Sequence, residues 1–166
     1  MTVDEQAERT TKVADEVWIA AALLHREQPE RKDFTIQEIR ERVEREAMTE
    51  TLRPGVYVHI VQHCVANRSP NPGRYRMLFA TAPKTRRLFR EGDAYDAERA
   101  GSKTRPDRKN VPEQYRELID WYERDYRGRR DADNEDPILK LRGLGGELWR
   151  GIDPDDYVRR LREGWE

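Results

Sequence analysis

The chain has 166 residues, of which 39% are charged and 36% belong to the hydrophobic set. This length allows one domain with appendages or two small domains, and so polar a chain forms a core only where its apolar residues are concentrated. The longest apolar run, from Val17 to Leu24, is too short to span a bilayer, and the acidic residues before it are unlike a signal peptide. The single cysteine, Cys64, excludes an internal disulfide and fits a reducing compartment, so we expect a cytoplasmic protein without membrane contact.

Charge is distributed unevenly along the chain. Residues 1–52 hold 8 Lys/Arg against 13 Asp/Glu (net −5), residues 53–110 hold 13 against 5 (net +8), and residues 111–166 hold 11 against 15 (net −4). A basic block between acidic flanks suggests a polyanion site in the middle of the chain. The alternative is a solvated basic surface that pairs with the acidic ends.

Three helices are expected in the first 68 residues. Apolar residues at helical spacing predict the first over about residues 3–27. The segment Thr35 to Glu38 (TIQE) has the pattern of a capping box and predicts a second helix that begins near Ile36. Pro54 suits the first position of a third helix, which is expected to extend to Arg68.

The third helix is expected to have one buried side and one side with hydrogen-bonding tips. Its buried side would consist of Val56, Tyr57, Ile60, Val61 and Cys64. Its other side would present His59, Gln62, His63 and Ala66. Side chains of Gln and His can hydrogen-bond base edges in a major groove.

A basic hairpin is expected next, with strands over residues 74–81 and 86–90 around a turn at 82–85. The predicted fold class is therefore mainly α with a small β-hairpin: a winged helix-turn-helix body, an extra helix, and an extended or helical C-terminal tail. Cations of the hairpin would neutralise phosphates. The predicted DNA-binding residues are Arg53, His59, Gln62, His63, Arg68, Arg74, Arg76, Lys84, Arg86 and Arg87. RNA, or a protein ligand on the same scaffold, is the alternative.

The remainder of the chain divides into a helix, a linker and a tail. Pro112 opens a fourth helix over residues 112–126, whose apolar stripe can dock on the body and complete a domain of residues 1–126. Residues 127–136 lack a large apolar side chain and are expected to form a flexible linker. Residues 137–166 form the predicted partner-binding tail.

The tail is expected to need a partner in order to fold. Ordering its residues costs on the order of 30–60 kcal/mol, whereas each buried aromatic side chain returns about 4–6 kcal/mol at most. The alternative is that it packs back on the body. The predicted partner-binding residues are Leu144, Leu148, Trp149, Ile152, Tyr157, Val158, Leu161, Arg162 and Trp165.

Residues 141–166 (LRGLGGELWRGIDPDDYVRRLREGWE) resemble the C-terminal toxin-binding tail of type II antitoxins, especially the VapB-type partners of PIN-domain ribonucleases. The resemblance implies a tail that wraps the toxin, with an arginine that reaches its acidic metal-binding site. Arg162 matches that arginine best, ahead of Arg159 and Arg160. The body departs from that family: RPGVxVHIxQHCVANRxPNPGRYRMLF followed by LFRxGD is similar to an uncharacterised bacterial winged-helix domain.

These observations favour an antitoxin of a type II toxin–antitoxin system. It would repress its own operon through residues 35–90 and neutralise a toxin, a PIN-type ribonuclease, through residues 138–165. Its partners would be the cognate toxin and operator DNA, with a homodimer left open. The alternatives are a stand-alone winged-helix transcriptional regulator, whose tail serves self-packing or dimerisation, and an adaptor that does not bind DNA.

The sequence offers His59 and His63 as candidates for a metal site and the glycines at 143–146 as a candidate phosphate loop. His59 and His63 are four apart and can share an ion, but Cys64 is expected in the core and nothing is spaced to complete the shell. The glycines at 143–146 lack the Lys-Ser/Thr of a phosphate loop, and no serine has the context of a nucleophile elbow. We expect no metal, no cofactor and no enzymatic activity.

Overall fold

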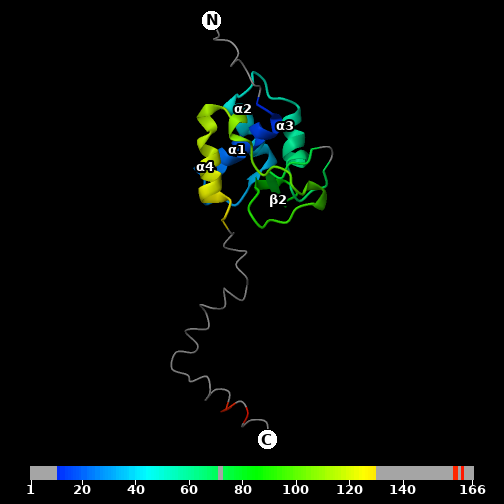
Figure 1. Cartoon of the computed structure of the whole chain (residues 1–166), viewed down its shortest axis with the longest axis vertical. Coiled ribbons are helices and arrows are strands. Elements are labelled where there is room, and N and C mark those ends of the chain that lie inside the picture. Colours follow the sequence, from blue (N-terminus) through cyan, green and yellow to red (C-terminus); the bar gives the residue numbers. More distant parts are fainter. Residues whose placement is uncertain (1–10, 71–72, 130–158, 161, 163–166) are drawn as a thin grey trace. The chain divides into compact units, whose positions relative to one another are not determined.

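The computed structural model describes residues 11–70, 73–129, 159–160 and 162, and the chain divides into two units, residues 1–129 and 130–166. The first unit contains four α-helices and three strands, shown in Figure 1: α1 (Val13–Glu27), β1 (Phe34–Thr35), α2 (Ile36–Glu46), α3 (Gly55–Val58), β2 (Leu78–Ala82), β3 (Thr85–Leu88) and α4 (Glu117–Trp121). Two π-helices continue helices directly, η1 (His59–His63) after α3 and η5 (Tyr122–Tyr126) after α4. Short 3-10 turns are η2 (Ala97–Arg99), η3 (Arg108–Asn110) and η4 (Glu113–Tyr115). The expected mainly helical fold with a small β element is confirmed.

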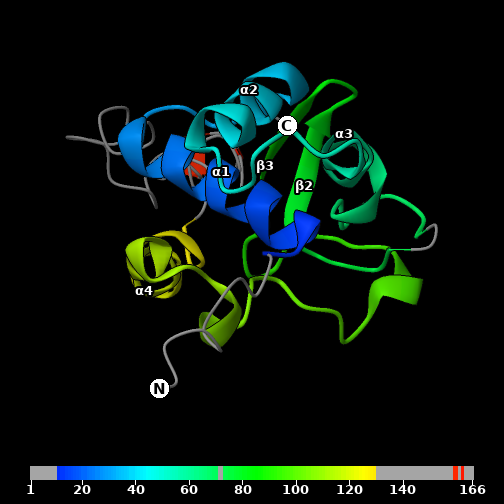
Figure 2. The ribbon, with the colours of Figure 1, turned by 90° about the horizontal axis from the view of Figure 1, so that it is seen from above.

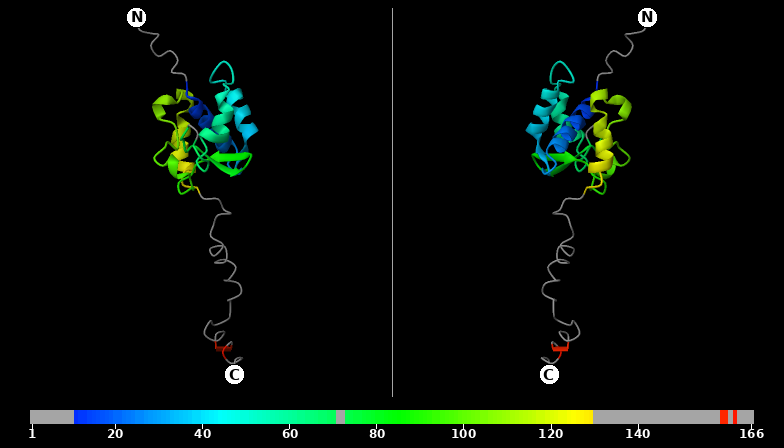
Figure 3. Two further views of the ribbon diagram at one scale, coloured as in Figure 1. Left: turned by 90° about the vertical axis from the view of Figure 1, so that its right-hand side faces the viewer. Right: turned by 90° about the vertical axis from the view of Figure 1, so that its left-hand side faces the viewer.

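Helix α1 lies at the centre of this unit, with α2 and α3 on one side and α4 on the other (Figures 2 and 3). Trp18 and Ile19 are fully buried, and the Trp18 ring meets Tyr122 edge-on at 5.6 Å between centroids. Burial of each such side chain stabilises the fold by about 1.5–3 kcal/mol. The helix begins at Val13, so the expected start near residue 3 is wrong: the N-cap, Lys12, has extended backbone.

Helix α2 begins where the sequence predicts. The Glu38 amide donates to Thr35 Oγ1 (3.1 Å) and the Thr35 amide donates to Glu38 Oε2 (2.7 Å), which is the expected capping box. The helix ends at Ala47 in left-handed backbone, with φ of 47°.

The three strands form an antiparallel sheet in the order β1-β3-β2. Strand β1 was not predicted; it pairs Phe34 with Arg86 and Thr35 with Thr85. The expected first hairpin strand is shorter than residues 74–81, because the Arg76 amide donates to Lys103 and the Met77 amide to Cys64 rather than to a neighbouring strand. The turn between β2 and β3 falls at residues 83–84.

The third helix is also shorter than expected. Backbone bonds five residues apart, such as Cys64 to His59 (3.0 Å), replace the α-helical pattern after Val58, and beyond Cys64 the chain pairs with Leu78. The predicted faces are therefore wrong at two positions: Tyr57 is 55% exposed and Ala66 is buried.

The segment that follows the sheet covers α1 with aromatic residues. The helix expected over residues 112–126 consists of η4, α4 and η5, and its predicted apolar stripe is buried: Tyr115, Leu118, Ile119 and Tyr122. Within the described ranges, none of the helices has the length and apolar character that a membrane span requires. Of the expected linker, Arg127 to Arg129 are described and exposed, and residues 130–136 lie outside the described residues.

Candidate nucleic-acid interface

Arg86 was predicted to contact phosphates, and the structure contradicts this. Its side chain is fully buried, and its Nε and Nη2 donate to the carbonyl oxygens of Ile60 (3.1 Å) and Val61 (3.4 Å). Its Nη1 donates to the carbonyl oxygens of Ala82 (3.0 Å) and Thr85 (2.8 Å) at the hairpin turn. Burial lowers the pKa of Arg86 to about 10, so the group stays positive at neutral pH. Arg86 therefore ties the hairpin turn to the last turn of the third helix.

Arg99 has the same role and was not among the predicted residues. Its buried guanidinium donates to the carbonyl oxygens of Gln62 (2.8 Å), His63 (2.8 Å), Arg68 (2.7 Å) and Tyr75 (2.6 Å). With Arg86 it binds four successive carbonyl groups, residues 60–63, at a helix end where such groups lack intrahelical partners. No local pattern around position 99 signals this role, since its partners come from other parts of the chain.

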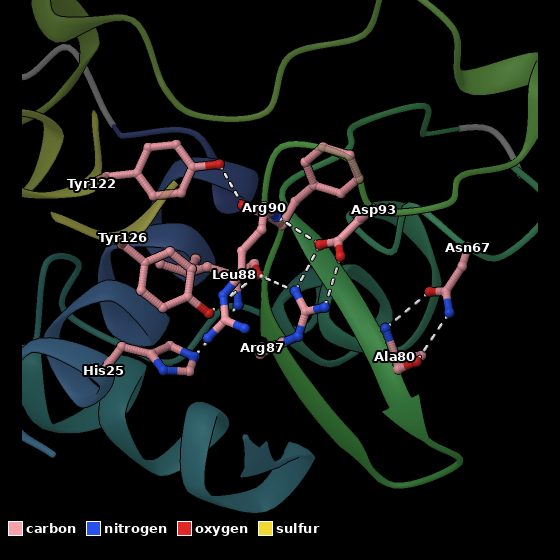
Figure 4. A network of polar contacts seen from close by, with 10 residues as sticks. His25, Asn67, Ala80, Arg87, Leu88, Arg90, Asp93, Tyr122 and Tyr126 are labelled. Atoms are coloured by element: carbon pink, nitrogen blue, oxygen red, sulfur yellow. Dashed lines mark hydrogen bonds and ion pairs between the residues drawn. The ribbon is translucent and has the colours of Figure 1, made fainter. Parts of the chain in front are cut away.

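Arg87 is the second contradicted prediction. It is 5% exposed, lies over the Phe79 ring at 4.5 Å, and donates to both Asp93 oxygens at 2.7 and 2.8 Å (Figure 4). Asp93 also accepts the Arg90 amide at 2.7 Å. Such a buried bidentate pair is lost only at a large cost, so Arg87 is not available to a phosphate.

Arg53 and Arg76 are partly buried and engaged within the protein. Arg53 pairs with the buried carboxylate of Glu16 at 2.9 Å. Arg76 lies over the Tyr95 ring at 4.4 Å, and its Nε donates to the Ser102 carbonyl at 3.1 Å. The predicted phosphate contact of Arg53 would compete with its ion pair, whereas Arg76 is held in orientation by its Nε and by the Tyr95 ring.

The polar side chains predicted to contact bases, those of His59, Gln62 and His63, are half-buried. His59 Nδ1 donates to the Gly55 carbonyl (2.8 Å), the His59 and His63 rings lie 4.9 Å apart, and the Gln62 amide donates to the Ser69 carbonyl. Gly73 packs on His63 so closely that a Cβ there would lie 2.7 Å from His63 Cβ. Burial lowers the pKa of His59, which favours its neutral form. The loop after η1 thus covers the side expected to enter a groove.

Five residues form what we call the candidate interface: Tyr57, Val58, Arg68, Arg74 and Lys84. Tyr57 and Val58 are 55% and 42% exposed, Arg74 and Lys84 are exposed, and Arg68 is half-buried. The three cations have no ion-pair partner within residues 11–70 and 73–129. Tyr57 and Arg68 lie near enough to Arg86 to influence its pKa, and Arg86 binds the turn that carries Lys84. The interface is therefore smaller than predicted and includes the last two residues of α3.

The side chain of Asn67 fixes the edge of the sheet beside this interface. Its Oδ1 accepts the Ala80 amide (2.9 Å) and its Nδ2 donates to the Ala80 carbonyl (3.0 Å), as a strand partner would (Figure 4). These bonds hold β2 against the segment that follows η1. The sequence did not single out Asn67.

No cluster of three His, Cys, Asp or Glu side chains suited to a metal ion occurs in the part of the chain that the structure describes. Cys64 is fully buried, and burial raises the pKa of its thiol far above the usual range. Such a thiol stays protonated and unreactive at neutral pH.

Most predicted partner-binding residues lie outside the described residues: Leu144, Leu148, Trp149, Ile152, Tyr157, Val158, Leu161 and Trp165. Arg162 is described and exposed, as are Arg159 and Arg160, and all three have helical backbone. Comparison with known proteins gives no relative: no family model matches the chain, and no curated protein or solved structure matches it.

Proposed function

We propose that the chain is a type II antitoxin whose first unit is a winged helix-turn-helix DNA-binding domain. The observation that carries the DNA-binding part is the topology. The order α1-β1-α2-α3-β2-β3, with a sheet in the order β1-β3-β2, matches the order of elements in winged-helix domains, and the β2–β3 turn is tied by Arg86 to the third helix. In this proposal the exposed end of α3 and Lys84 of the β2–β3 turn belong to one DNA-binding surface.

In this proposal the C-terminal end of α3 enters the major groove. Tyr57 and Val58 would make apolar contacts with base edges, including thymine methyl groups. Arg68, Arg74 and Lys84 would neutralise phosphates beside the groove. His59, Gln62 and His63 would hold the helix rather than read bases, because their polar atoms already contact the protein.

The antitoxin part rests on the resemblance of residues 141–166 to toxin-binding tails. The mechanism would be steric and electrostatic: the tail covers a PIN-type ribonuclease, and Arg162 replaces or repels the metal in its carboxylate cluster. The complex would also repress the operon that encodes both proteins. A cytoplasmic location belongs to this proposal.

DNA binding is tested by fluorescence anisotropy with the upstream promoter region at several salt concentrations. The variant Arg68→Gln/Arg74→Gln/Lys84→Gln is expected to flatten the slope of log K against log salt by about 2–3, since three phosphate contacts are lost. The matched control Arg26→Gln/Arg45→Gln/Lys109→Gln removes the same charge from exposed positions elsewhere and is expected to keep the slope. Equal effects of the two triple variants would mean that general charge, not the candidate interface, drives binding.

Toxin neutralisation is tested by co-expression of the full chain with the neighbouring gene product. Trp149→Ala/Trp165→Ala and Arg162→Glu are expected to lose protection against growth arrest while DNA affinity is kept. Arg124→Glu, which introduces the same change on the exposed side of η5, is the control. Full protection by the tail variants would favour the stand-alone regulator instead.

A further inference from the structure

A pocket of about 330 Å³ lies outside the candidate interface, between the turn after β3 and η5. Its principal lining residues are Arg76, Phe89, Tyr95, Thr104, Tyr122 and Arg127. This volume is at the lower end of the range for small-molecule sites, which corresponds to a ligand of metabolite size.

The walls of the pocket are held by specific bonds. Tyr122 is fully buried, and its hydroxyl donates to the Phe89 carbonyl at 2.5 Å (Figure 4). The turn from Arg90 to Asp93 closes with an Asp93 amide to Arg90 carbonyl bond (3.1 Å), and Gly92 has φ of 90°. A positive φ at the third position is the geometry of a type II turn, which favours glycine. The pocket is therefore formed in advance of any ligand.

The guanidinium of Arg76 is oriented by stacking on two rings. It lies 4.4 Å from the Tyr95 centroid and 5.6 Å from the Phe89 centroid, and the two rings meet edge-to-face. Its Nε is fixed by the Ser102 carbonyl, and among the described residues it has no ion-pair partner. A planar guanidinium held in this way suits bidentate recognition of a carboxylate with little further loss of entropy.

The other charged residues of the lining are mostly neutralised. Arg127 pairs with Glu123 at 2.8 Å, and Asp93 pairs with Arg87. Glu91 also lines the pocket and is exposed. Arg76 is thus the cation of the described lining that is available to an anion.

We propose that this pocket binds a small aromatic or unsaturated carboxylic acid. The carboxylate pairs with the Nη groups of Arg76, and the flat apolar part packs beside Phe89 and Tyr95. The site is separate from the candidate interface and does not depend on DNA or toxin binding.

The test uses the full chain without DNA and benzoate as the probe, with binding measured by calorimetry and by amide shifts in NMR spectra. Benzoate is expected to bind saturably and to shift the amides of residues 89–95. Benzamide, which has the same shape without the charge, is expected to bind at least tenfold more weakly, as charged hydrogen bonds contribute that much. Saturable binding of neither probe, or equal binding of both, overturns the proposal.

Substitutions of the lining residues test whether benzoate binds in this pocket. Arg76→Gln and Arg76→Lys are each expected to weaken benzoate at least tenfold, because lysine keeps the charge but not the planar pair of donors. Glu91→Gln removes a like charge from the lining and is expected to tighten binding about two- to fivefold. Arg124→Gln, on the exposed side of η5, is expected to leave affinity unchanged. Unchanged benzoate affinity in Arg76→Gln, or in Glu91→Gln, contradicts the assignment of this pocket. Loss of DNA binding in any variant does not bear on it.

Discussion

Two regions of the first unit are held together by different chemistry. The layer of α1 and α4 is joined by apolar and aromatic contacts, such as those of Trp18, Ile19 and Tyr122. The region of α3, η1 and the hairpin is joined by guanidinium groups, chiefly Arg86 and Arg99, that donate to backbone carbonyls. The second region therefore depends on buried charges that are costly to desolvate and more costly to leave without partners.

This difference shows why a basic stretch of sequence need not form a basic surface. Arg86, Arg87 and Arg99 belong to the block of net +8, yet their side chains are inside the protein. The exposed cations of this block are Arg74, Lys84, Lys103, Arg108 and Lys109. Part of the charge in this block therefore stabilises the fold and does not contribute to the surface.

The largest effect is expected from Arg99→Met. Loss of the guanidinium removes the donor that Arg99 supplies to the carbonyl groups of His63, Arg68 and Tyr75 in a buried site. The free energy of unfolding is expected to fall by roughly 3–5 kcal/mol. Urea unfolding followed by far-UV circular dichroism measures this change.

The control for Arg99→Met is Arg108→Met, which makes the same change where the side chain is 55% exposed and pairs with Asp120 on the surface. Its cost is expected to stay within about 1 kcal/mol. Similar losses in the two variants would show that buried guanidinium groups do not hold the hairpin region.

The sequence predicted features whose causes are local. The pattern of Thr35 and Glu38 located the start of α2, and the apolar stripe of residues 115–122 identified the segment that covers α1. It could not separate interior from surface arginines, because Arg86 and Arg99 are fixed by carbonyl groups that are distant in the chain. It also missed the π-turn at His59–His63 and the exposure of Tyr57.

His25 joins the two regions and is expected to control part of the pH dependence. Burial, and then the positive charges of Arg90 and Arg87, lower its pKa to about 3, and its Nε2 accepts the Leu88 amide at 3.4 Å. The unfolded chain binds this proton near pH 6.5, so the stability that neutral His25 contributes is complete above 6.5 and is lost as the pH falls towards 3.

The contribution of Asp15 to stability changes with pH in the opposite direction to that of His25. Burial raises its pKa to about 6 from 3.8, so its contribution is present below 3.8 and is lost as the pH rises through 6. Between pH 6 and 4.5 the two groups offset each other, at about 1.4 kcal/mol per pH unit each. His25→Leu is therefore expected to gain stability on acidification in this window relative to wild type, and Asp15→Asn to lose it. Urea midpoints at pH 6, 5.2 and 4.5 give the slopes, and parallel slopes in the two variants would contradict the assignment.

The smallest effect is expected from Thr35→Ala, which removes the side-chain acceptor of the Glu38 amide and leaves the backbone pairing of β1 with β3 in place. Loss of such a cap costs about 1 kcal/mol. Thr35→Ser keeps the acceptor and is expected to lie within a few tenths of a kcal/mol of wild type. The urea midpoint is expected to change without a change in m, because the exposed cap alters stability and not the extent of burial. A capping box acts locally at the surface, so its loss is expected to lower the free energy of unfolding several times less than the loss of Arg99. Equal losses would mean that α2 and the hairpin region depend on each other through Thr35. The division into two regions would then be wrong.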